Sequence, residues 1–451
     1  MDVPPLILPI CSVQPDFNVS IRDVNDGFVT EETFWVSCYK AGEESVHGEV
    51  HASLNERDRN KVDYDGRKGV AFKAGTEPNS YYAACDERGI SFTRVIIPEK
   101  IFSDPLPQTG KGQQYQKIYA FDVAPDGSQF AVGYNDGSVY LVPTASSSTH
   151  SIARRAHLST ITSVRFFPSS RVLLTSGLDF SLSILPAEIP EPSNDPVRIN
   201  PVRTLKGHSR TVTSTAIIAR GRTVLSASKD ATLRLWDVSS GSQIRMMGTK
   251  SFVPVNAVSA GERAESVFTP PPDGAENPEA IPSGQDPREV ETADKIVYCA
   301  LANGTFEVFD LGAKLSVYHS SAGAFTSSPL ESITYSATHS LLATGSANGI
   351  VTVYDTRSID APLAQFKRNG ASIEDLAFVP GSDGGDIGLG VATSDGLPYI
   401  ANVRPEGPSV RAELIGTDCD GVRCVKAGPE GTVWTASDDG IVRRYGRVSV
   451  L

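Results

Sequence analysis

The sequence is poor in several features that mark special classes of protein. Its 451 residues include only 3 Met, 3 Trp and 6 Cys, so a disulfide scaffold is excluded and we expect reduced thiols. No apolar run reaches the roughly 18 residues that a membrane-spanning helix needs. The N-terminal stretch carries Asp2 and several prolines and lacks the basic start of a secretion signal. We therefore expect a soluble protein of the cytoplasm, with the nucleus as a second location.

Positive charge is also in short supply. Lys and Arg number 41 against 53 Asp and Glu, which gives a formal net charge of -12. This balance disfavours a nucleic-acid or anionic-membrane surface and favours a basic partner surface. The hydrophobic content of 40% and charged content of 21% are typical of a globular chain. The length allows one large core with a smaller domain beside it.

One stretch, residues 204–242, carries a specific repeat pattern. It has Gly207-His208 near its start and Trp236-Asp237 near its end, which is the signature of one four-stranded propeller blade. Between them, Val212 to Ile218 and Thr223 to Ser228 are rich in β-branched residues and are separated by a Gly-bearing turn. These two runs predict a hairpin within the blade.

The polar residues of this motif predict a buried network. His208, Ser226, Asp230 and Trp236 have the spacing at which carboxylate, imidazole, hydroxyl and indole satisfy one another by hydrogen bonds. A Ser, His and Asp set also suggests a hydrolase. We reject that interpretation because the spacing places these groups inside a blade, where they fix strand register.

The same spacing recurs along the chain after residue 117. Seven copies align on a turn residue that lies four after a strand position and six before an aromatic or apolar position. The seven turn residues are Asp136, Asp179, Asp230, Asn303, Asn348, Asp395 and Asp439. Seven units are enough to close a ring without exposed sheet edges. The predicted fold is therefore all-β, a seven-bladed WD40 β-propeller preceded by a small β-rich domain.

The composition also predicts domain boundaries. Residues 1–30 contain several prolines and suggest an irregular arm, and 31–98 suggest a small β-rich domain. The last run of this domain, Ile90 to Ile97, is a candidate for the outer strand that closes the ring. Residues 99–117 are expected to be a linker to the propeller of 118–451. A Pro-rich, acidic segment at about 259–294 should be a disordered insertion between the first and second strands of the fourth blade.

Candidate metal ligands are sparse. His47 and His51 are four residues apart near Cys38, but alternation in a strand places them too far apart for easy chelation. Cys419 and Cys424 lack a second pair of ligands. No nucleophile with a matching base converges with other polar groups in the pattern. We predict no metal, no cofactor and no enzymatic activity.

A set of acidic residues is the best candidate for partner binding. Glu374, Asp375, Asp418 and Asp420 lie in or near segments entering blades, and Asp438 lies in a turn between strands. These positions are expected to gather at one mouth of the ring. A solvated rim is the plain alternative. On an acidic protein, a docking surface for a basic partner is the stronger hypothesis.

The run from Ala216 to Ser228 resembles the corresponding blade of the proteasomal ATPase-associated factor family, the WD-repeat chaperones of proteasome regulatory-particle assembly. An N-terminal domain followed by seven blades agrees with that family, whereas the insertion at about 259–294 departs from it. The resemblance implies a chaperone, monomeric when free, that binds the basic C-terminal domains of proteasomal AAA ATPase subunits.

A second function remains open. Tyr354-Asp355-Thr356-Arg357 approximates the WDxR motif by which substrate receptors bind cullin-type ubiquitin ligases. The alternative hypothesis is therefore a WD40 substrate receptor or adaptor, with Arg357 as its key contact.

Overall fold

The computed structural model describes ten ranges of the chain: residues 4–58, 61–103, 108–109, 114–145, 150–191, 195–263, 286–321, 328–381, 387–403 and 408–447. The chain divides into two compact units. The first unit is Met1–Asp2, Gln108–Ala347 and Thr352–Leu363, and the second is Val3–Pro107, Asn348–Val351 and Ala364–Leu451. Strands β31 (Ile350–Asp355) and β32 (Pro362–Lys367) therefore each contain residues of both units.

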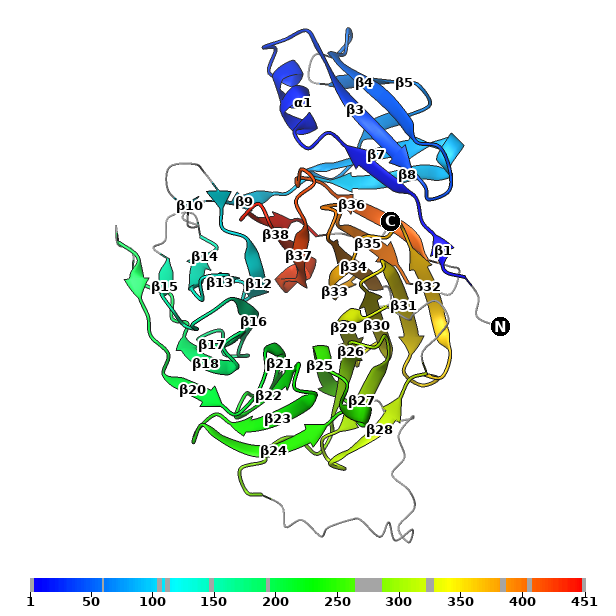
Figure 1. Ribbon diagram of the computed structural model, residues 1–451. Coiled ribbons are helices and arrows are strands. Elements are labelled where there is room, and N and C mark those ends of the chain that lie inside the picture. Colours follow the sequence, from blue (N-terminus) through cyan, green and yellow to red (C-terminus); the bar gives the residue numbers. More distant parts are fainter. Residues whose placement is uncertain are drawn as a thin grey trace. The chain divides into compact units, whose positions relative to one another are not determined.

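Sheets with four antiparallel strands follow one another along the first unit (Figure 1). Sheet one is β12 (Ile118–Val123), β13 (Gln129–Tyr134), β14 (Val139–Pro143) and β15 (Ser151–Ala153), with β19 (Val197–Arg198) parallel to β15. Sheet two is β16 (Ile161–Phe166), β17 (Val172–Gly177), β18 (Ser181–Pro186) and β20 (Arg203–Lys206). Sheet three is β21 (Val212–Ile218), β22 (Thr223–Ser228), β23 (Thr232–Asp237) and β24 (Ser242–Gly248). Sheet four is β25 (Val255–Glu262), β26 (Lys295–Leu301), β27 (Phe306–Asp310) and β28 (Leu315–His319).

Two smaller pairs complete the described strands of this unit. The antiparallel pair β29 (Leu330–Ser336) and β30 (Leu341–Ser346) continues the series, and β10 (Gln108–Thr109) pairs with β11 (Gln114–Tyr115). A short 3-10 turn, Lys250–Phe252, precedes β25. The first strands of successive sheets, from β12 to β29, pack side by side.

The sheets of the first unit pack face to face. Between sheets two and three lies a cluster that includes Leu174, Ile184 and Val224, together with Trp236. Similar aliphatic clusters fill the spaces between sheets one and two and between sheets three and four. Every residue of β22 is buried, including Thr223, Ser226 and Ser228, so this strand lies inside the sheet stack on both of its faces. Burial of these faces is the main stabilising contribution in stacked sheets.

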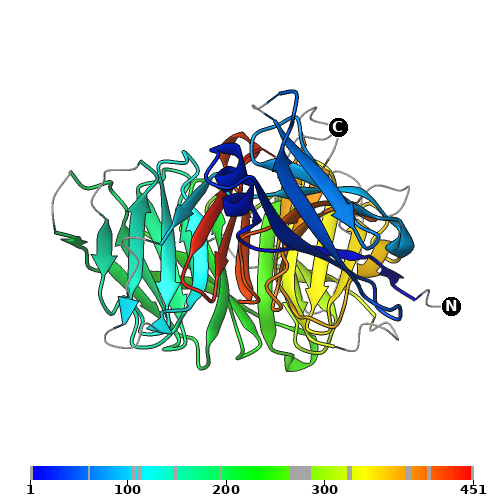
Figure 2. The ribbon, with the colours of Figure 1, turned by 90° about the horizontal axis from the view of Figure 1, so that it is seen from above.

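The antiparallel pairing sets where the turns lie. In a four-stranded antiparallel sheet the first strand begins at the same end as the turn between the second and third strands. We call this end of each sheet the leading end. In Figure 2 the strands of the first unit run in one general direction, so the turns collect at two opposite ends.

The predicted turn residues all lie between consecutive strands. Asp136, Asp179, Asp230, Asn303, Asn348, Asp395 and Asp439 follow β13, β17, β22, β26, β30, β34 (Ile387–Thr393) and β38 (Val433–Ser437) in that order. WD-type sheets of four strands are therefore present, as the spacing predicted.

The N-terminal part of the second unit differs from the expected irregular arm. Residues 4–30 contain β1 (Leu6–Ile7), β2 (Ile10–Val13) and helix α1 (Phe17–Asn25). Strand β2 joins β3 (Glu31–Tyr39), β4 (Val46–Leu54) and β5 (Val62–Arg67) in an antiparallel sheet. Helix α1 buries Phe17, Ile21 and Val24, a spacing of four and three residues that places all three side chains on one face.

The next strands are shared with the C-terminal part of the chain. β6 (Ala71–Ala74), β7 (Ser80–Cys85) and β8 (Ile90–Ile96) form antiparallel pairs, with a 3-10 turn, Asp86–Arg88, between β7 and β8. β8 then lies parallel to β36 (Ser409–Leu414), with Arg94 opposite Ala412. β33 (Ile373–Pro380), β34 and β35 (Tyr399–Asn402) complete this seven-stranded sheet. Residues 31–98 thus contribute β3, β4 and β5 to a sheet made of N-terminal strands alone, and they add β8 to a sheet of C-terminal strands.

The expected linker also contributes to a sheet. β9 (Lys100–Phe102) pairs with β39 (Val442–Tyr445), next to β38 and β37 (Val422–Ala427), and a 3-10 turn, Pro429–Gly431, precedes β38. Similarly, β1 lies parallel to β32, with Leu6 opposite Phe366. The N-terminal strands β1, β8 and β9 thus pair with strands from the C-terminal part of the chain, a pairing that the sequence predicted only for the run that contains β8.

The connection between β25 and β26 begins later in the chain than the sequence predicted. β25 continues to Glu262, and residues 264–285, where disorder was expected, lie outside the described ranges. Residues 286–294 are described and are bonded to sheet three. Glu289 accepts from Arg245 at 2.8 Å, and Glu291 accepts from the Arg220 backbone N–H at 3.2 Å.

The β9 pairing leads to a stability prediction. Phe102 is buried and stacks on Trp434 with ring centroids 5.6 Å apart. We expect Phe102→Ala to destabilise this sheet by about 3 kcal/mol and to accelerate amide exchange in β39, as measured by hydrogen–deuterium exchange. Ile101→Ala is the matched control because Ile101 is 54% exposed on the same strand. Equal exchange in both variants would contradict the structural role of β9.

Candidate functional site

The four polar residues of the sheet-three motif are brought together. The indole Nε1–H of Trp236 donates to the Ser226 hydroxyl at 2.9 Å. The Ser226 hydroxyl lies 2.7 Å from Nε2 of His208, and Nδ1 of His208 lies 2.9 Å from the Asp230 carboxylate. All four side chains are satisfied when the Ser226 hydroxyl donates to Nε2 of His208 and the Nδ1–H of His208 donates to Asp230.

The surroundings of this network keep Asp230 ionised and His208 neutral. Burial lowers the pKa of His208 below its ordinary value, although the hydrogen bond to Asp230 opposes this shift. Burial would raise the pKa of Asp230, but hydrogen bonds from the Thr232 hydroxyl, the Ser209 N–H and His208 outweigh it and lower the pKa to about 2. The network therefore ties the segment before β21 to the turn after β22.

Sheet two contains a shorter version of the same network. His157 lies 2.9 Å from Asp179 through Nδ1 and 2.9 Å from the Thr175 hydroxyl through Nε2. Leu185 occupies the position of the tryptophan, and it is fully buried. An apolar residue there leaves no indole N–H to satisfy, so the network is complete with three residues.

This geometry does not fit a hydrolytic triad. Ser226 is fully buried, and its oxygen already accepts from Trp236. A nucleophilic hydroxyl must reach a substrate carbonyl, and Ser226 is closed off from one. The network is a structural element.

Three of the five predicted acidic residues form ion pairs within the second unit. The Arg423 guanidinium on β37 makes two hydrogen bonds to Asp438, at 2.9 and 3.0 Å, and one to Glu374 on β33, at 2.9 Å. Lys426, also on β37, donates to Asp375. Glu374 and Asp375 thus link β33 to β37, and Asp438 links the turn after β38 to β37, which the sequence analysis did not foresee.

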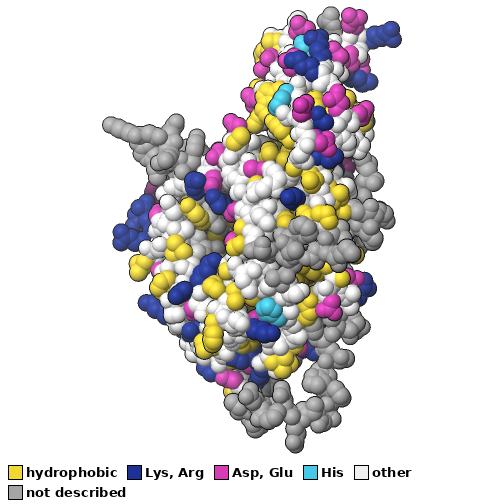
Figure 3. All heavy atoms as spheres, turned by 45° about the vertical axis from the view of Figure 1, so that its right-hand side comes forward, with side chains coloured by type: hydrophobic (Ala, Val, Ile, Leu, Met, Phe, Trp, Pro, Cys, Tyr) yellow, Lys and Arg dark blue, Asp and Glu magenta, His cyan; other side chains and the backbone are white. Residues whose placement is uncertain are grey.

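The other two predicted acids lie on an exposed segment. Asp418 and Asp420 are exposed on the loop 415–421, which leads into β37. The set thus has five carboxylates, of which Glu374, Asp375 and Asp438 pair with the cations Arg423 and Lys426, and the formal charge of these seven residues together is negative. We call these seven residues the acidic cluster. On the face drawn in Figure 3, acidic and basic side chains are interspersed and do not form one continuous patch of either sign.

Arg423 and Lys426 are the residues that sequence reasoning missed. The signal in the sequence was a pair of basic residues three positions apart in one strand and two consecutive acids in another strand. Their pairing depends on which strands lie side by side. The Asp438 hydrogen bonds, with Glu374 nearby, raise the pKa of Arg423 above its ordinary value, so this cation remains charged.

The candidate metal ligands are placed apart from one another. His47 contacts the Ser37 hydroxyl at 2.9 Å, and His51 contacts the Thr33 hydroxyl at 3.3 Å. Cys419 is exposed whereas Cys424 is buried. Among the residues that the structure describes, no group of three His, Cys, Asp or Glu side chains could hold a metal ion.

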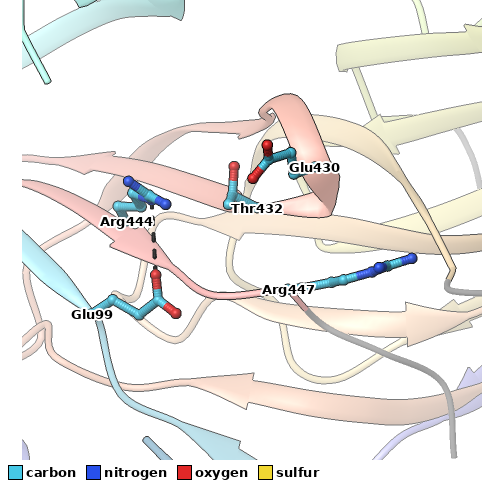
Figure 4. A pocket seen from close by; sticks show the side chains of 5 residues that line it. All are labelled: Glu99, Glu430, Thr432, Arg444 and Arg447. Atoms are coloured by element: carbon cyan, nitrogen blue, oxygen red, sulfur yellow. Dashed lines mark ion pairs between the residues drawn. The ribbon is translucent and has the colours of Figure 1, made fainter. Parts of the chain in front are cut away.

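A shallow hollow of about 520 Å³ lies beside β9 and β39, lined by Glu99, Glu430, Thr432, Arg444 and Arg447. In Figure 4, Glu99 and Arg444 face each other, and their charged atoms are 3.8 Å apart. Two acids balance two arginines, so this hollow offers no net charge to select a ligand.

Comparisons with known proteins agree with the sheet geometry. Residues 147–184, 199–237 and 317–355 each match the WD domain, G-beta repeat family. These three segments of the chain thus carry WD repeats. The matches include most of β18, all of β23 and all of β31, and they lie mostly in the first unit.

Three relatives are informative. The WD-repeat protein is 29% identical over 289 residues to the 26S proteasome regulatory subunit RPN14 of Saccharomyces cerevisiae, covering 63% of this chain and 64% of that one. It is 26% identical over 121 residues to SEC12-like protein 2 of Arabidopsis thaliana, 27% of each chain. It is 56% identical over 41 residues to the small ribosomal subunit protein RACK1 of Saccharomyces cerevisiae, 9% of this chain and 13% of that one. The matched part thus spans less than two thirds of each relative.

The WD-repeat protein shows no candidate for a membrane span: within the described ranges, the helices are too short or too polar to cross a bilayer.

The network in sheet three gives a stability prediction for the WD-repeat protein. Ser226→Ala leaves the Trp236 indole N–H without its acceptor in a buried site, so we expect a loss of about 2 kcal/mol in the free energy of unfolding. A urea titration followed by circular dichroism measures the loss. Ser209→Ala, at an exposed position of the same sheet's leading end, is the control and should change stability by less than about 0.5 kcal/mol. Similar losses in both variants would show that the network contributes nothing particular.

Acidification gives a further prediction. The folded pKa of Asp230 is about 2, below the unfolded value of about 4. The unfolded chain therefore binds the proton first, and stability is lost as pH falls from about 4 to about 2. The Asp230→Asn variant lacks this carboxyl. The difference in free energy of unfolding between the natural protein and this variant should therefore decrease by about 2 kcal/mol as the pH falls from 5 to 2.

The exposed acid Glu188 provides the control for this titration. Urea titrations at both pH values should show no such narrowing for Glu188→Gln. A constant deficit for Asp230→Asn at both pH values would mean that the Asp230 carboxylate is not stabilised by folding.

Proposed function

We propose that this chain is a non-enzymatic assembly chaperone that binds the C-terminal domains of proteasomal ATPase subunits. The observation that carries the proposal is the similarity over 289 residues to the 26S proteasome regulatory subunit RPN14. The predicted resemblance to the proteasomal ATPase-associated factor family rests on a shorter stretch, Ala216 to Ser228, which lies within this similarity. The two observations lead to the same class of partner.

The proposal includes a closed seven-bladed propeller as the binding platform. Seven turn residues with one spacing each lie between two strands, and N-terminal strands supply outer strands to C-terminal sheets. A ring closed by strands from both ends of a chain has no exposed sheet edge. Such a rigid platform holds its loops in fixed positions for binding.

The acidic cluster supplies the charge for a basic partner. Its carboxylates outnumber its cations, and Asp418 and Asp420 lie on an exposed loop. Arg423 holds Glu374 and Asp438 in fixed positions, so a docking lysine or arginine meets a preorganised set of acceptors. Complementary charge of this kind contributes to association rate and to selection of the partner.

The test is capture of purified proteasomal ATPase C-terminal domains on the immobilised chain. We expect the double variant Asp418→Asn/Asp420→Asn to bind the captured domain about fivefold more weakly, because exposed charge pairs contribute up to about 1 kcal/mol in sum. Raising the salt from about 0.05 to about 0.3 M should weaken capture by the natural chain as well. Isothermal titration calorimetry gives the affinities.

The matched control is Glu188→Gln/Glu191→Gln, which removes two exposed acids of the first unit and should leave the affinity unchanged. Failure to capture any of the ATPase domains at the lower salt concentration removes the proposal. Capture that is equally weakened by both double variants would retain the partner but reject the acidic cluster as its site.

The alternative function has one supporting observation. Arg357 is exposed and is held by two contacts to Asp355, of 2.9 and 2.7 Å, which fixes the guanidinium outward as a receptor motif requires. If Arg357→Ala abolishes capture of a cullin ligase adaptor while ATPase domains are not captured by any variant, the receptor function replaces the chaperone function.

A further inference from the structure

The leading ends of sheets two, three and four lie on one face of the first unit. The Thr162 hydroxyl near the start of β16 donates to the carbonyl of Val212, the first residue of β21. The Thr213 hydroxyl donates to the carbonyl of Val255, the first residue of β25, at 2.9 Å. These two bonds align the starts of the three first strands, so their turns lie at the same end of three neighbouring sheets.

Large apolar side chains are exposed on this surface. Leu158 is 86% and Phe252 is 82% exposed, and Leu178 and Phe180 are more than one third exposed. Three of them are close together, because the Leu158 N–H donates to Asp179 at 2.9 Å and the Leu178 N–H donates to the Thr160 carbonyl at 3.0 Å. Scattered single apolar residues need no explanation, but a group on one set of turns indicates an interaction site.

Two of these side chains are held in an unfavourable backbone conformation. Phe180 has φ of 67° and Phe252 has φ of 53°, in the left-handed region that bulky residues rarely adopt. Each such residue costs about 1 kcal/mol or more. Both rings remain exposed, so burial within the fold does not offset this cost. A strained residue whose side chain is not buried is a candidate for contact with a partner.

The charge of this surface is opposite to that of the whole chain. Its exposed charged residues in the turns of sheets two to four are Arg154, Arg155, Arg210 and Lys250. The acids of the same turns, Asp179 and Asp230, are turned inward to His157 and His208. The WD-type network therefore removes the negative charge from the surface and leaves the positive charge exposed.

We propose that these turns form a docking surface for an acidic peptide segment that carries large apolar side chains. The four apolar residues Leu158, Leu178, Phe180 and Phe252 would contact its apolar side chains, and the arginines and lysine would pair with its carboxylates. The surface lies in the first unit and uses none of the acidic cluster, so it does not depend on the proposed function. A nucleic acid is the less favoured occupant because the chain as a whole carries a net charge of -12.

The experiment selects peptides from a phage-displayed library of random twelve-residue sequences on the immobilised full-length chain. We expect enrichment of peptides rich in Asp and Glu that contain Phe, Leu or Trp. A fluorescein-labelled copy of the most enriched peptide then gives affinities by fluorescence anisotropy. Phe252→Ser and Arg210→Glu should each weaken its binding at least about tenfold, as expected for a central contact.

The controls carry the same chemical changes on the opposite end of the sheets. Val202→Ser removes an apolar side chain that is 70% exposed before β20, and Arg171→Glu reverses an exposed charge before β17. Both should leave the affinity within about twofold. All four positions are exposed, so the variants are expected to fold, and circular dichroism verifies this.

Other outcomes would overturn the proposal. Enrichment of basic or uncharged peptides, or no enrichment, would reject an acidic ligand. A self-association that sedimentation velocity detects and that Phe252→Ser abolishes, without peptide binding, would assign the surface to a second copy. Displacement of the peptide by a single-stranded oligonucleotide that binds more tightly would assign it to nucleic acid. Capture of ATPase domains through Asp418 and Asp420 would be unaffected by any of these results.

Discussion

The buried hydrogen bonds of the leading ends determine what this protein presents to its surroundings. In sheet three, Asp230 accepts from His208 inside the fold, and His208 is tied through Ser226 to Trp236. Since the carboxylate is desolvated, its charge is stabilised only where these donors are in place. The turns are therefore held in one conformation, and their remaining side chains project from fixed positions.

The consequence is a division of surface charge between the two units. In the first unit, Asp179 and Asp230 are used within the fold, and basic and apolar side chains remain exposed on the same turns. In the second unit, the acids outnumber their partners Arg423 and Lys426. The two proposed partner surfaces therefore differ in charge, since the one in the second unit is acidic and the one in the first unit is basic and apolar. A net charge of -12 conceals this difference.

The N-terminal strands add a second kind of constraint. β8 pairs with β36 and β9 pairs with β39, so residues about three hundred positions apart share sheets. Pairing of distant segments covers edges that would otherwise be open to other chains. It also joins β8 and β9 to C-terminal sheets, although β2 to β5 keep a sheet and a hydrophobic cluster of almost entirely N-terminal residues.

Local features were predictable because they depend on neighbouring residues. The spacing of Gly207-His208 and Trp236-Asp237 identified the WD pattern, and the seven turn residues lie between strands as that pattern requires. Helix α1 was missed although Phe17, Ile21 and Val24 have helical spacing, because the prolines around them suggested irregular structure.

The sequence by itself thus determined the strands and turns of the repeats and the residues of the buried network, since each follows from the spacing of apolar and polar side chains over a few dozen residues. Only the tertiary structure decided which charges remain exposed. Whether Glu374 faces solvent or Arg423 depends on strands 49 residues apart lying side by side, and whether Phe252 is exposed depends on how its turn is held. Electrostatic pairing acts through space, so these properties follow from the fold and not from the order of residues along the chain.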